Sequence, residues 1–333
     1  MNSFGRLFRV TIFGESHGKG VGISVDGCPG GVPLSEADFS ADIERRRAGK
    51  PGTTPRAEKD IPNIMNGVFE GTTTGAPIMI QFYNADTDPS SYDNIRNTPR
   101  PGHSDYAAYR KHGGYNDYRG GGHFSGRITV GIVAAGVVAR KLLGDMKITA
   151  QVLEAGGEKD AVAAAVAAQR EMVPVGALVE VRVEGVPAGL GEPFFDSVEA
   201  VLSHLMFSVP GVKGIEFGTG FACAKMRGSQ FNDPFVHIDG TTRTNHSGGI
   251  NGGITNGNPI VFRVAVRPTS SIGMVQDTVN LKTGEPDVLE VRGRHDACIG
   301  LRFPPILESM TAIGLADLLA MSRATNATTQ KPR

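Results

Sequence analysis

Apolar and polar residues alternate in several short segments, a pattern typical of half-buried strands. The clearest runs from Leu178 to Val183, where valines at 179, 181 and 183 alternate with charged residues. Glycine-bounded apolar segments over 8–13, 66–83 and 261–267 predict three more strands. The chain therefore contains several strands with one face turned to a core.

Other segments carry apolar residues at helical spacing. Ile128 to Ala139 is apolar and alanine-rich, which predicts a fully buried helix. Helices are also predicted over 160–172, over 306–321 and around an apolar stripe between Val198 and Met206. These strands and helices do not alternate in a regular rhythm, and no G-x-G-x-x-G motif follows a strand, so the pattern does not support a dinucleotide-binding domain.

A weak internal repeat links two distant segments. GTTTGAPI at 71–78 and GITNGNPI at 253–260 share Gly, Thr, Gly, Pro and Ile at the same places, at an offset of 182 residues (253 minus 71). The repeat indicates a duplicated fold whose halves intertwine. We therefore expect one domain over residues 1–333, with a polar tail from Ser322 that is loose.

Composition narrows the class of protein. The 34 basic and 34 acidic residues cancel, which argues against a general nucleic-acid or membrane-surface binder. The three cysteines, Cys28, Cys223 and Cys298, have no metal-ligand spacing, so we expect no metal site and a reducing compartment. No signal peptide is recognised at the start, and the longest apolar run falls short of the ~20 residues that span a bilayer. These features predict a soluble, cytoplasmic protein.

Basic residues and histidines gather locally between Arg100 and Arg127. This stretch, RPGHSDYAAYRKHGGYNDYRGGGHFSGR, contains five Lys or Arg residues and three histidines against two acids. Its glycines let the backbone approach a ligand closely, and it leads into the predicted buried helix, whose N-terminus favours anions. We interpret it as a site for a multiply anionic ligand with histidines that move protons near neutral pH. Tyrosines between the basic residues leave an RNA contact as an alternative.

Shorter polar groups add to this picture. A predicted helix starts at Ser35, with Asp38 in the capping-box position, and ends in three arginines at 45–47. These arginines either complement the helix dipole or bind carboxylate or phosphate. Arg267 to Ser271 places a basic residue beside three hydroxyls, which suits a phosphate or a flavin edge. Asp296 lies between apolar segments, which suits a partly buried acid that handles protons.

Taken together, these motifs resemble the chorismate synthase family over nearly the whole chain. The matching signatures are FGESHG at 13–18, DIERRR at 42–47, RPGHSDY at 100–106, DYRGGG at 117–122, GVPAGLGEP at 185–193, RGSQ at 227–230, NHSGGINGGI at 245–254, RPTSSI at 267–272 and GRHDACIG at 293–300. So many ordered matches are specific, whereas a single one would not be.

The resemblance implies a carbon–oxygen lyase of the shikimate pathway. Such an enzyme converts 5-enolpyruvylshikimate 3-phosphate to chorismate and phosphate by an anti-1,4-elimination. It requires reduced FMN without net redox change, and NADPH would serve only indirectly, to reduce the flavin. The resemblance also implies an α+β fold, a β-α-β sandwich with internal duplication and helices between antiparallel sheets, and assembly into a homotetramer.

The resemblance also implies roles for individual residues. The substrate carries two carboxylates and a phosphate, and the candidates to bind them are Arg46, Arg47, Arg100 and Arg127. His103 matches the histidine that sits protonated near the reduced flavin, and His17 matches the histidine that donates a proton to the departing phosphate. Asp296 matches the acid that works with the flavin in removing the substrate proton.

Cofactor contacts also carry over by position. The residues implied are His123, Phe124, Ser125, Gly211, Gly252, Arg267, Pro268, Thr269, Ser270, Ser271 and Arg294. The sequence departs from the common family pattern at His123-Phe124, at Arg267, where lysine is usual, and at Pro210-Gly211. Two other functions stay open at this point: an RNA-contacting module built on 100–127, and a flavin oxidoreductase on the same scaffold.

Overall fold

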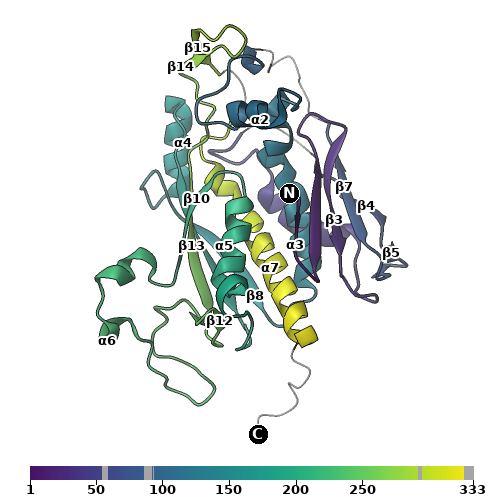
Figure 1. Ribbon diagram of the computed structural model, residues 1–333, viewed down its shortest axis with the longest axis vertical. Coiled ribbons are helices and arrows are strands. Elements are labelled where there is room, and N and C mark those ends of the chain that lie inside the picture. Colours follow the sequence, from purple (N-terminus) through teal and green to yellow (C-terminus); the bar gives the residue numbers. More distant parts are fainter. Residues whose placement is uncertain (55–58, 86–91, 93, 292–294, 326–333) are drawn as a thin grey trace.

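Two antiparallel sheets enclose a layer of helices in the computed structural model, which describes residues 1–54, 59–85, 92, 94–291 and 295–325 (Figure 1). The first sheet has the strand order β1 (Ser3–Phe4), β2 (Arg9–Gly14), β3 (Gly20–Asp26), β7 (Ile78–Tyr83), β4 (Asn63–Asn66). The second has the order β10 (Val212–Phe217), β13 (Ile260–Val266), β9 (Ala177–Glu184), β8 (Lys147–Ala155). The fold is therefore α+β, with a β-α-β sandwich as expected.

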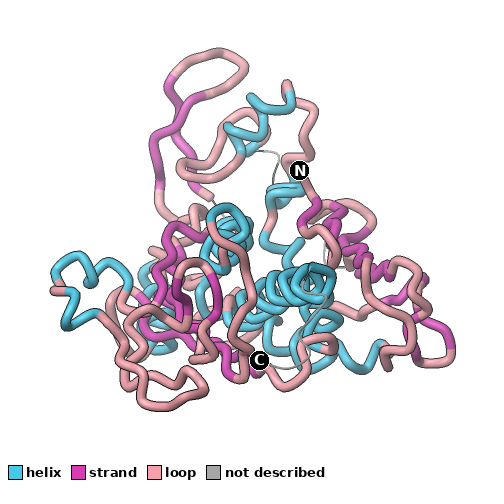
Figure 2. Tube along the Cα trace, turned by 60° about the horizontal axis from the view of Figure 1, so that its bottom comes forward, coloured by secondary structure: helices cyan, strands magenta, loops and turns pink. Residues whose placement is uncertain are grey.

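Helices α3 (Thr129–Arg140), α5 (Val198–Ser208) and α7 (Pro304–Thr325) fill the middle layer. Figure 2 shows these helices between two groups of strands. Residues Thr129 to Ala139 of α3 are all buried, as an apolar segment without a polar face requires. One hydrophobic core cluster joins side chains of both sheets, such as Ile23 and Phe262, with side chains of α3 and α7.

Helices α3 and α7 approach closely because α3 has a glycine at the crossing. A methyl carbon placed on Gly136 would lie 2.2 Å from Cβ of Ser309 on α7. No larger residue fits there at the present helix separation. Helix α7 is also long and apolar enough to cross a membrane, but 78% of its apolar window is buried within the protein. It is a core helix.

The two halves of the chain share one topology. In the first half β2, β3, α1 (Ser40–Arg46), β4, β7 and α3 follow in order, and the neighbouring strands are β2-β3-β7-β4. In the second half β8, β9, α5, β10, β13 and α7 follow in order, with neighbours β8-β9-β13-β10. The repeated sequence forms equivalent elements, since each copy makes a small hairpin and then enters the middle strand β7 or β13. The hairpins are β5–β6 (Val68–Phe69 and Thr72–Thr73) and β11–β12 (Ile250–Asn251 and Ile254–Thr255).

Most predicted elements are present, with shifted ends. The alternating segment forms β9, whose Val181 lies opposite Phe262 of β13. The alanine-rich segment forms α4 (Ala161–Glu171), with the Asp160 carboxylate accepting a hydrogen bond from the Ala163 N–H. The single strand predicted over 66–83 is wrong: it is the end of β4, a hairpin and β7, because Gly67, Gly71 and Gly75 take positive φ. Helix α7 continues to Thr325, beyond the start of the predicted tail, and residues 326–333 lie outside the described part.

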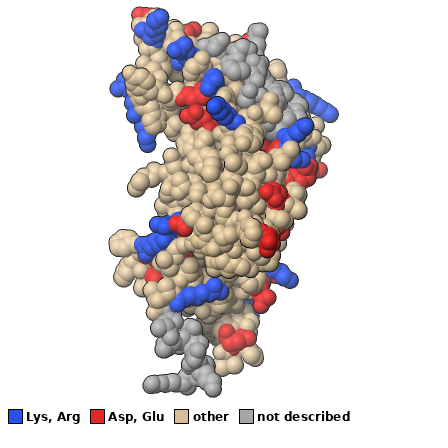
Figure 3. All heavy atoms as spheres, turned by 90° about the vertical axis from the view of Figure 1, so that its right-hand side faces the viewer, with Lys and Arg blue, Asp and Glu red and all other residues tan. Residues whose placement is uncertain are grey.

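Smaller elements complete the fold. They are η1 (Glu36–Phe39), α2 (Asp105–His112), η3 (Arg119–Phe124), η4 (Gly126–Ile128), η5 (Phe194–Asp196), η6 (Gly220–Lys225), α6 (Gly228–Phe231), β14 (Val275–Val279), β15 (Pro286–Glu290) and η7 (Ile299–Arg302). Figure 3 shows the side of the molecule formed by the first sheet, whose middle carries few charged side chains.

Candidate active site

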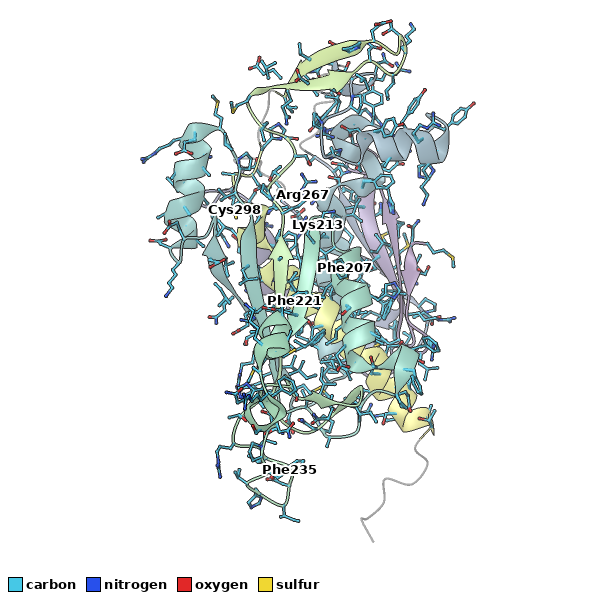
Figure 4. All side chains as sticks on the ribbon, turned by 60° about the vertical axis from the view of Figure 1, so that its left-hand side comes forward. Phe207, Lys213, Phe221, Phe235, Arg267 and Cys298 are labelled. Carbon is cyan, nitrogen blue, oxygen red and sulfur yellow. The ribbon has the colours of Figure 1, made fainter. Side chains whose placement is uncertain are left out.

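A cavity of about 1080 Å³ opens where the connections from the middle strands to the central helices meet. One connection links β7 to α3 and includes 100–128, and the other links β13 to α7 and includes 267–303. Figure 4 places Arg267, Lys213 and Phe207, which line this cavity, near the ends of β13, β10 and α5. The duplicated topology therefore brings two loops, far apart in sequence, to one site.

Two walls of the cavity differ in chemistry. Apolar side chains from β2, β3, α3, α5 and α7 form one wall, among them Ile12, Ile132 and Met310. The starts of α3 and α7 also line the cavity, but their N–H groups are already used: α7 begins with two prolines, the Ile306 and Leu307 N–H groups donate to the Phe303 carbonyl, and the Thr129 N–H donates within the turn before α3. An extended apolar surface beside arginine side chains suits a ligand that is part aromatic and part anionic.

Three consecutive arginines at the end of α1 reach three different surroundings. Arg45 makes two hydrogen bonds of 2.6 and 2.7 Å to the buried Glu308 of α7, which is a structural role. Arg46 turns inward, and burial lowers the pKa of its guanidinium. Arg47 lines the cavity at its rim and pairs with Glu44 at 2.6 Å. Of the three, Arg46 and Arg47, the two candidates for substrate binding, line the cavity.

Asp60 joins the two innermost arginines. Its carboxylate accepts hydrogen bonds from Nη1 of Arg46, at 3.3 Å, and from Nη1 of Arg127. All three residues are at least 93% buried and all three line the cavity. Sequence reasoning missed Asp60, because one acid in a polar loop carries no distinguishing signal.

Arg100 and His103 share a second carboxylate. Arg100 donates to both oxygens of Asp105, at 2.8 and 2.9 Å, and to the hydroxyl of Ser271, at 3.1 Å. Nδ1 of His103 lies 2.6 Å from Asp105, a separation that requires a proton between them. Burial alone would raise the pKa of Asp105, but hydrogen bonds from Arg100 and His103 hold it well below its usual range. His103 lines the cavity, and its Nε2 lies near Gly121.

His17 stands one residue behind the cavity wall. Its ring contacts Tyr92 edge-on with centroids 4.8 Å apart, and a methyl carbon on Gly120 would lie 2.4 Å from it. Tyr92 and Gly120 line the cavity, whereas His17 does not. Only glycine at 120, with φ of 57°, leaves space for the imidazole there.

Asp296 also lines the cavity, and two donors hold its carboxylate. The Thr54 N–H donates to one oxygen at 2.9 Å and Nη1 of Arg302 donates to the other at 3.1 Å. Arg302 also donates to the backbone carbonyl of Arg46, at 2.9 Å, and thereby connects Asp296 to the group formed by Arg46, Asp60 and Arg127. Arg302 was not predicted, because it sits in an apolar context before α7.

His295, next to Asp296, also lines the cavity. Burial lowers the pKa of its imidazole, and the nearby Arg100 lowers it further. Its Nε2 is buried and has no hydrogen-bond partner among the described residues. A neutral imidazole with an unsatisfied nitrogen is a further candidate to contact a ligand.

Most of the implied cofactor residues line this cavity. They are His123, Phe124, Ser125, Gly211, Arg267, Pro268, Thr269 and Ser270. Ser271 lies behind the wall, hydrogen-bonded to Arg100. Gly252 belongs to the β11–β12 hairpin, which does not line the cavity, and Arg294 lies outside the described residues.

Comparisons with known proteins agree with this geometry. The family model described as chorismate synthase matches residues 8–320. A chorismate synthase of Chitinophaga pinensis is 55% identical over 327 residues, covering 98% of both chains, and one of Methanosarcina acetivorans is 45% identical, covering 96% of both. A crystal structure of a chorismate synthase superposes with a TM-score of 0.73 at 25% identity, covering 96% of this chain and 93% of that one. On its sequence, its fold and its site, the chain belongs to the chorismate synthase family.

Proposed function

We propose that this protein converts 5-enolpyruvylshikimate 3-phosphate to chorismate and phosphate by anti-1,4-elimination, with reduced FMN. Family membership supports the reaction, and one observation carries it to this chain: Arg127, His103 and Asp296 line a single cavity. The substrate brings three anionic groups into an otherwise neutral protein, so a local cluster of guanidinium groups is required.

The cavity has the size and the chemistry for two ligands together. Its volume of about 1080 Å³ slightly exceeds the roughly 300–1,000 Å³ usual for one small-molecule site. The hydroxyls of Thr269 and Ser270 and the Arg267 guanidinium would hold the polar groups of FMN, and the apolar wall would cover its ring. When bound, reduced FMN supplies electron density to the allylic system as phosphate departs, with no net redox change.

The protein's own groups would bind the anions and move the protons. Arg47, Arg100 and Arg127 would bind the substrate's carboxylates and phosphate. The proton on Nδ1 of His103, held by Asp105, leaves Nε2 free to share a proton with the ligands. His17 would give a proton to the leaving phosphate once its imidazole turned past Gly120 to reach the cavity, and Asp296 would take up the substrate proton. Each such acid–base contribution amounts to roughly 10²–10⁴-fold in rate.

Assembly, reductant and location belong to the same proposal. The weakly charged outer side of the first sheet suits a subunit interface, which supports a homotetramer. NADPH would act only by reducing the flavin. The cysteines Cys28, Cys223 and Cys298 are all free, which supports a cytoplasmic location.

An anaerobic phosphate-release assay tests the reaction. The protein is mixed with 5-enolpyruvylshikimate 3-phosphate, with or without dithionite-reduced FMN. Phosphate and chorismate should appear together, and only with reduced FMN. His103→Ala and His17→Ala should lose turnover while keeping the thermal midpoint of the wild type. No phosphate release by the wild type would reject the function, and full activity of both variants would reject the roles of the histidines.

A further inference from the structure

We propose that Asp60 is a positioning residue that holds Arg46 and Arg127 in the arrangement the anionic substrate requires. This inference rests on the proposed function and adds a residue that neither composition nor motif indicates. It also gives the two arginines different roles: Arg46 has a structural role and Arg127 contacts the ligand.

The position of Asp60 supports this role. It precedes β4, Arg46 ends α1, and Arg127 lies just before α3, so three separate segments meet at one carboxylate. The side chain is 2% exposed, and those of Arg46 and Arg127 are 3% and 5% exposed. A carboxylate buried between two buried guanidinium groups is strongly held, because its loss would leave two buried positive charges without a counter-charge.

The backbone conformation of Asp60 is also unusual. Its φ is +47°, in the left-handed region that non-glycine residues seldom adopt, although Asp and Asn tolerate it best. This conformation costs free energy that the ion pairs offset. Strain retained at a residue that lines a cavity is a reason to suspect a role in function.

Counting donors separates the two arginines. Arg46 donates from Nε to the Thr129 hydroxyl at 3.0 Å, from Nη1 to Asp60, and from Nη2 to the carbonyls of Gly126 and Arg127 at 3.0 and 3.2 Å. Four of its five N–H groups are therefore used within the protein. Arg46 braces the start of α3 against the end of α1 and has little capacity left for a ligand.

Arg127 is less fully committed. Its Nε donates to Asn84 at 3.1 Å and its Nη1 to Asp60, while Nη2 is buried with no hydrogen-bond partner among the described residues. An unsatisfied buried donor on a charged group is costly, and an oxyanion in the cavity would satisfy it. The structure thus assigns Arg127 to the substrate and Arg46, with Asp60, to its support.

Removing the charge of Asp60 distinguishes positioning from simple electrostatics. If Asp60 only competed with the substrate for positive charge, Asp60→Asn would bind the substrate more tightly. If Asp60 positions Arg127, the same variant binds it more weakly, because displacement of a contact by about 1 Å can cost about 100-fold. Asparagine keeps the shape and tolerates the left-handed backbone, so the change is confined to charge and hydrogen bonding.

The experiment measures KM for 5-enolpyruvylshikimate 3-phosphate and kcat in the anaerobic assay, with reduced FMN in excess. For Asp60→Asn we expect KM to rise at least tenfold and kcat to fall less. The matched control is Glu184→Gln, which removes an exposed carboxylate from Arg182, away from the cavity, and should change KM by no more than about twofold. An unchanged or lowered KM in a folded Asp60→Asn protein would overturn the inference, while the active wild type would leave the proposed function intact.

A double-mutant cycle with Arg127→Gln tests whether Asp60 acts through Arg127. If it does, Asp60→Asn adds nothing to the KM of Arg127→Gln, whereas a further rise in the double variant would refute the mechanism. Asp60→Asn alone leaves two buried guanidinium groups without a carboxylate, whereas the double variant leaves only that of Arg46. The double variant should therefore fold more readily, and its KM can be compared with that of Arg127→Gln even if Asp60→Asn alone does not fold.

Discussion

The crossing of α3 and α7 offers a prediction in which two physical effects have opposite signs. In an open helix, Gly→Ala stabilises by about 1 kcal/mol, because alanine has less backbone freedom to lose. At Gly136 the new methyl carbon would lie 2.2 Å from Cβ, 2.4 Å from Oγ and 2.5 Å from Cα of Ser309. Carbon atoms prefer a separation of about 3.5–4.0 Å, so the helices must move apart by more than 1 Å.

The size of the destabilisation by Gly136→Ala depends on which atoms the new methyl group would meet. Overpacking a core costs about 1–3 kcal/mol, and the upper value applies here because the backbone of α7 is among the obstructing atoms. Subtracting the gain in helix propensity leaves Gly136→Ala less stable than the wild type by about 2 kcal/mol. Because Arg127 and Arg302 immediately precede these helices, the same displacement should lower kcat/KM.

Urea denaturation provides the assay, with the free energy of unfolding taken from the midpoint and slope. The control is Gly228→Ala in α6, where a methyl carbon would meet nothing within 4 Å, and which should not be destabilised. Ser309→Gly should restore part of the loss when combined with Gly136→Ala. A Gly136→Ala protein as stable as the wild type would refute the packing argument.

Three further predictions concern charged groups. Arg45→Met removes the guanidinium that pairs with the buried Glu308, which keeps a hydrogen bond from the Ala150 N–H. Because Arg45 itself is 45% exposed, the free energy of unfolding in urea should fall by only about 1–2 kcal/mol. The lowered pKa of Asp105 stabilises the fold at pH values above the unfolded pKa of about 3.9. The free energy of unfolding of Asp105→Asn should therefore lie below that of the wild type by a constant amount above pH ~5, and the difference should shrink as the pH falls below about 3.9. A deficit that persists unchanged in acid would contradict this. The lowered pKa of His295 has the opposite origin: the fold disfavours the charged form, so the wild type should lose stability relative to His295→Gln as pH falls through about 6.5, measured by urea midpoints. Equal pH profiles for the two proteins would exclude a buried neutral imidazole.

The sequence predicted the elements that carry strong periodic signals. Alternating valines predicted β9, and the apolar run from Ile128 predicted α3, because burial on one face or on all sides shows directly in the pattern. Helix α2 gave no such signal, since only Ala108 among its residues is buried. The hairpins before β7 and β13 were visible only as a repeat of glycines whose positive φ values the sequence does not reveal.

The sequence indicated which types of residue form the site, but not which residues contact one another. Motifs marked the arginines and histidines, yet three adjacent arginines look alike in sequence, and only packing sends Arg45 to Glu308 and Arg46 to Asp60. The single acids and bases that pair with them, Asp60 and Arg302, lie in segments without a pattern. A tertiary contact between such residues depends on long-range topology, which local sequence does not encode.

The order of the elements has a consequence for the newly made chain. Helix α3 is buried almost completely, and its closest helical partner, α7, is the last element described. Translation at about 5–20 residues per second needs roughly 10–30 s to make the 164 residues between Arg140 and Pro304 (304 minus 140). For that time the side of α3 that packs against α7 has no partner, although β3, β7 and α1 are already made and cover its other sides. This enzyme is therefore expected to depend on chaperones during synthesis more than its modest length suggests.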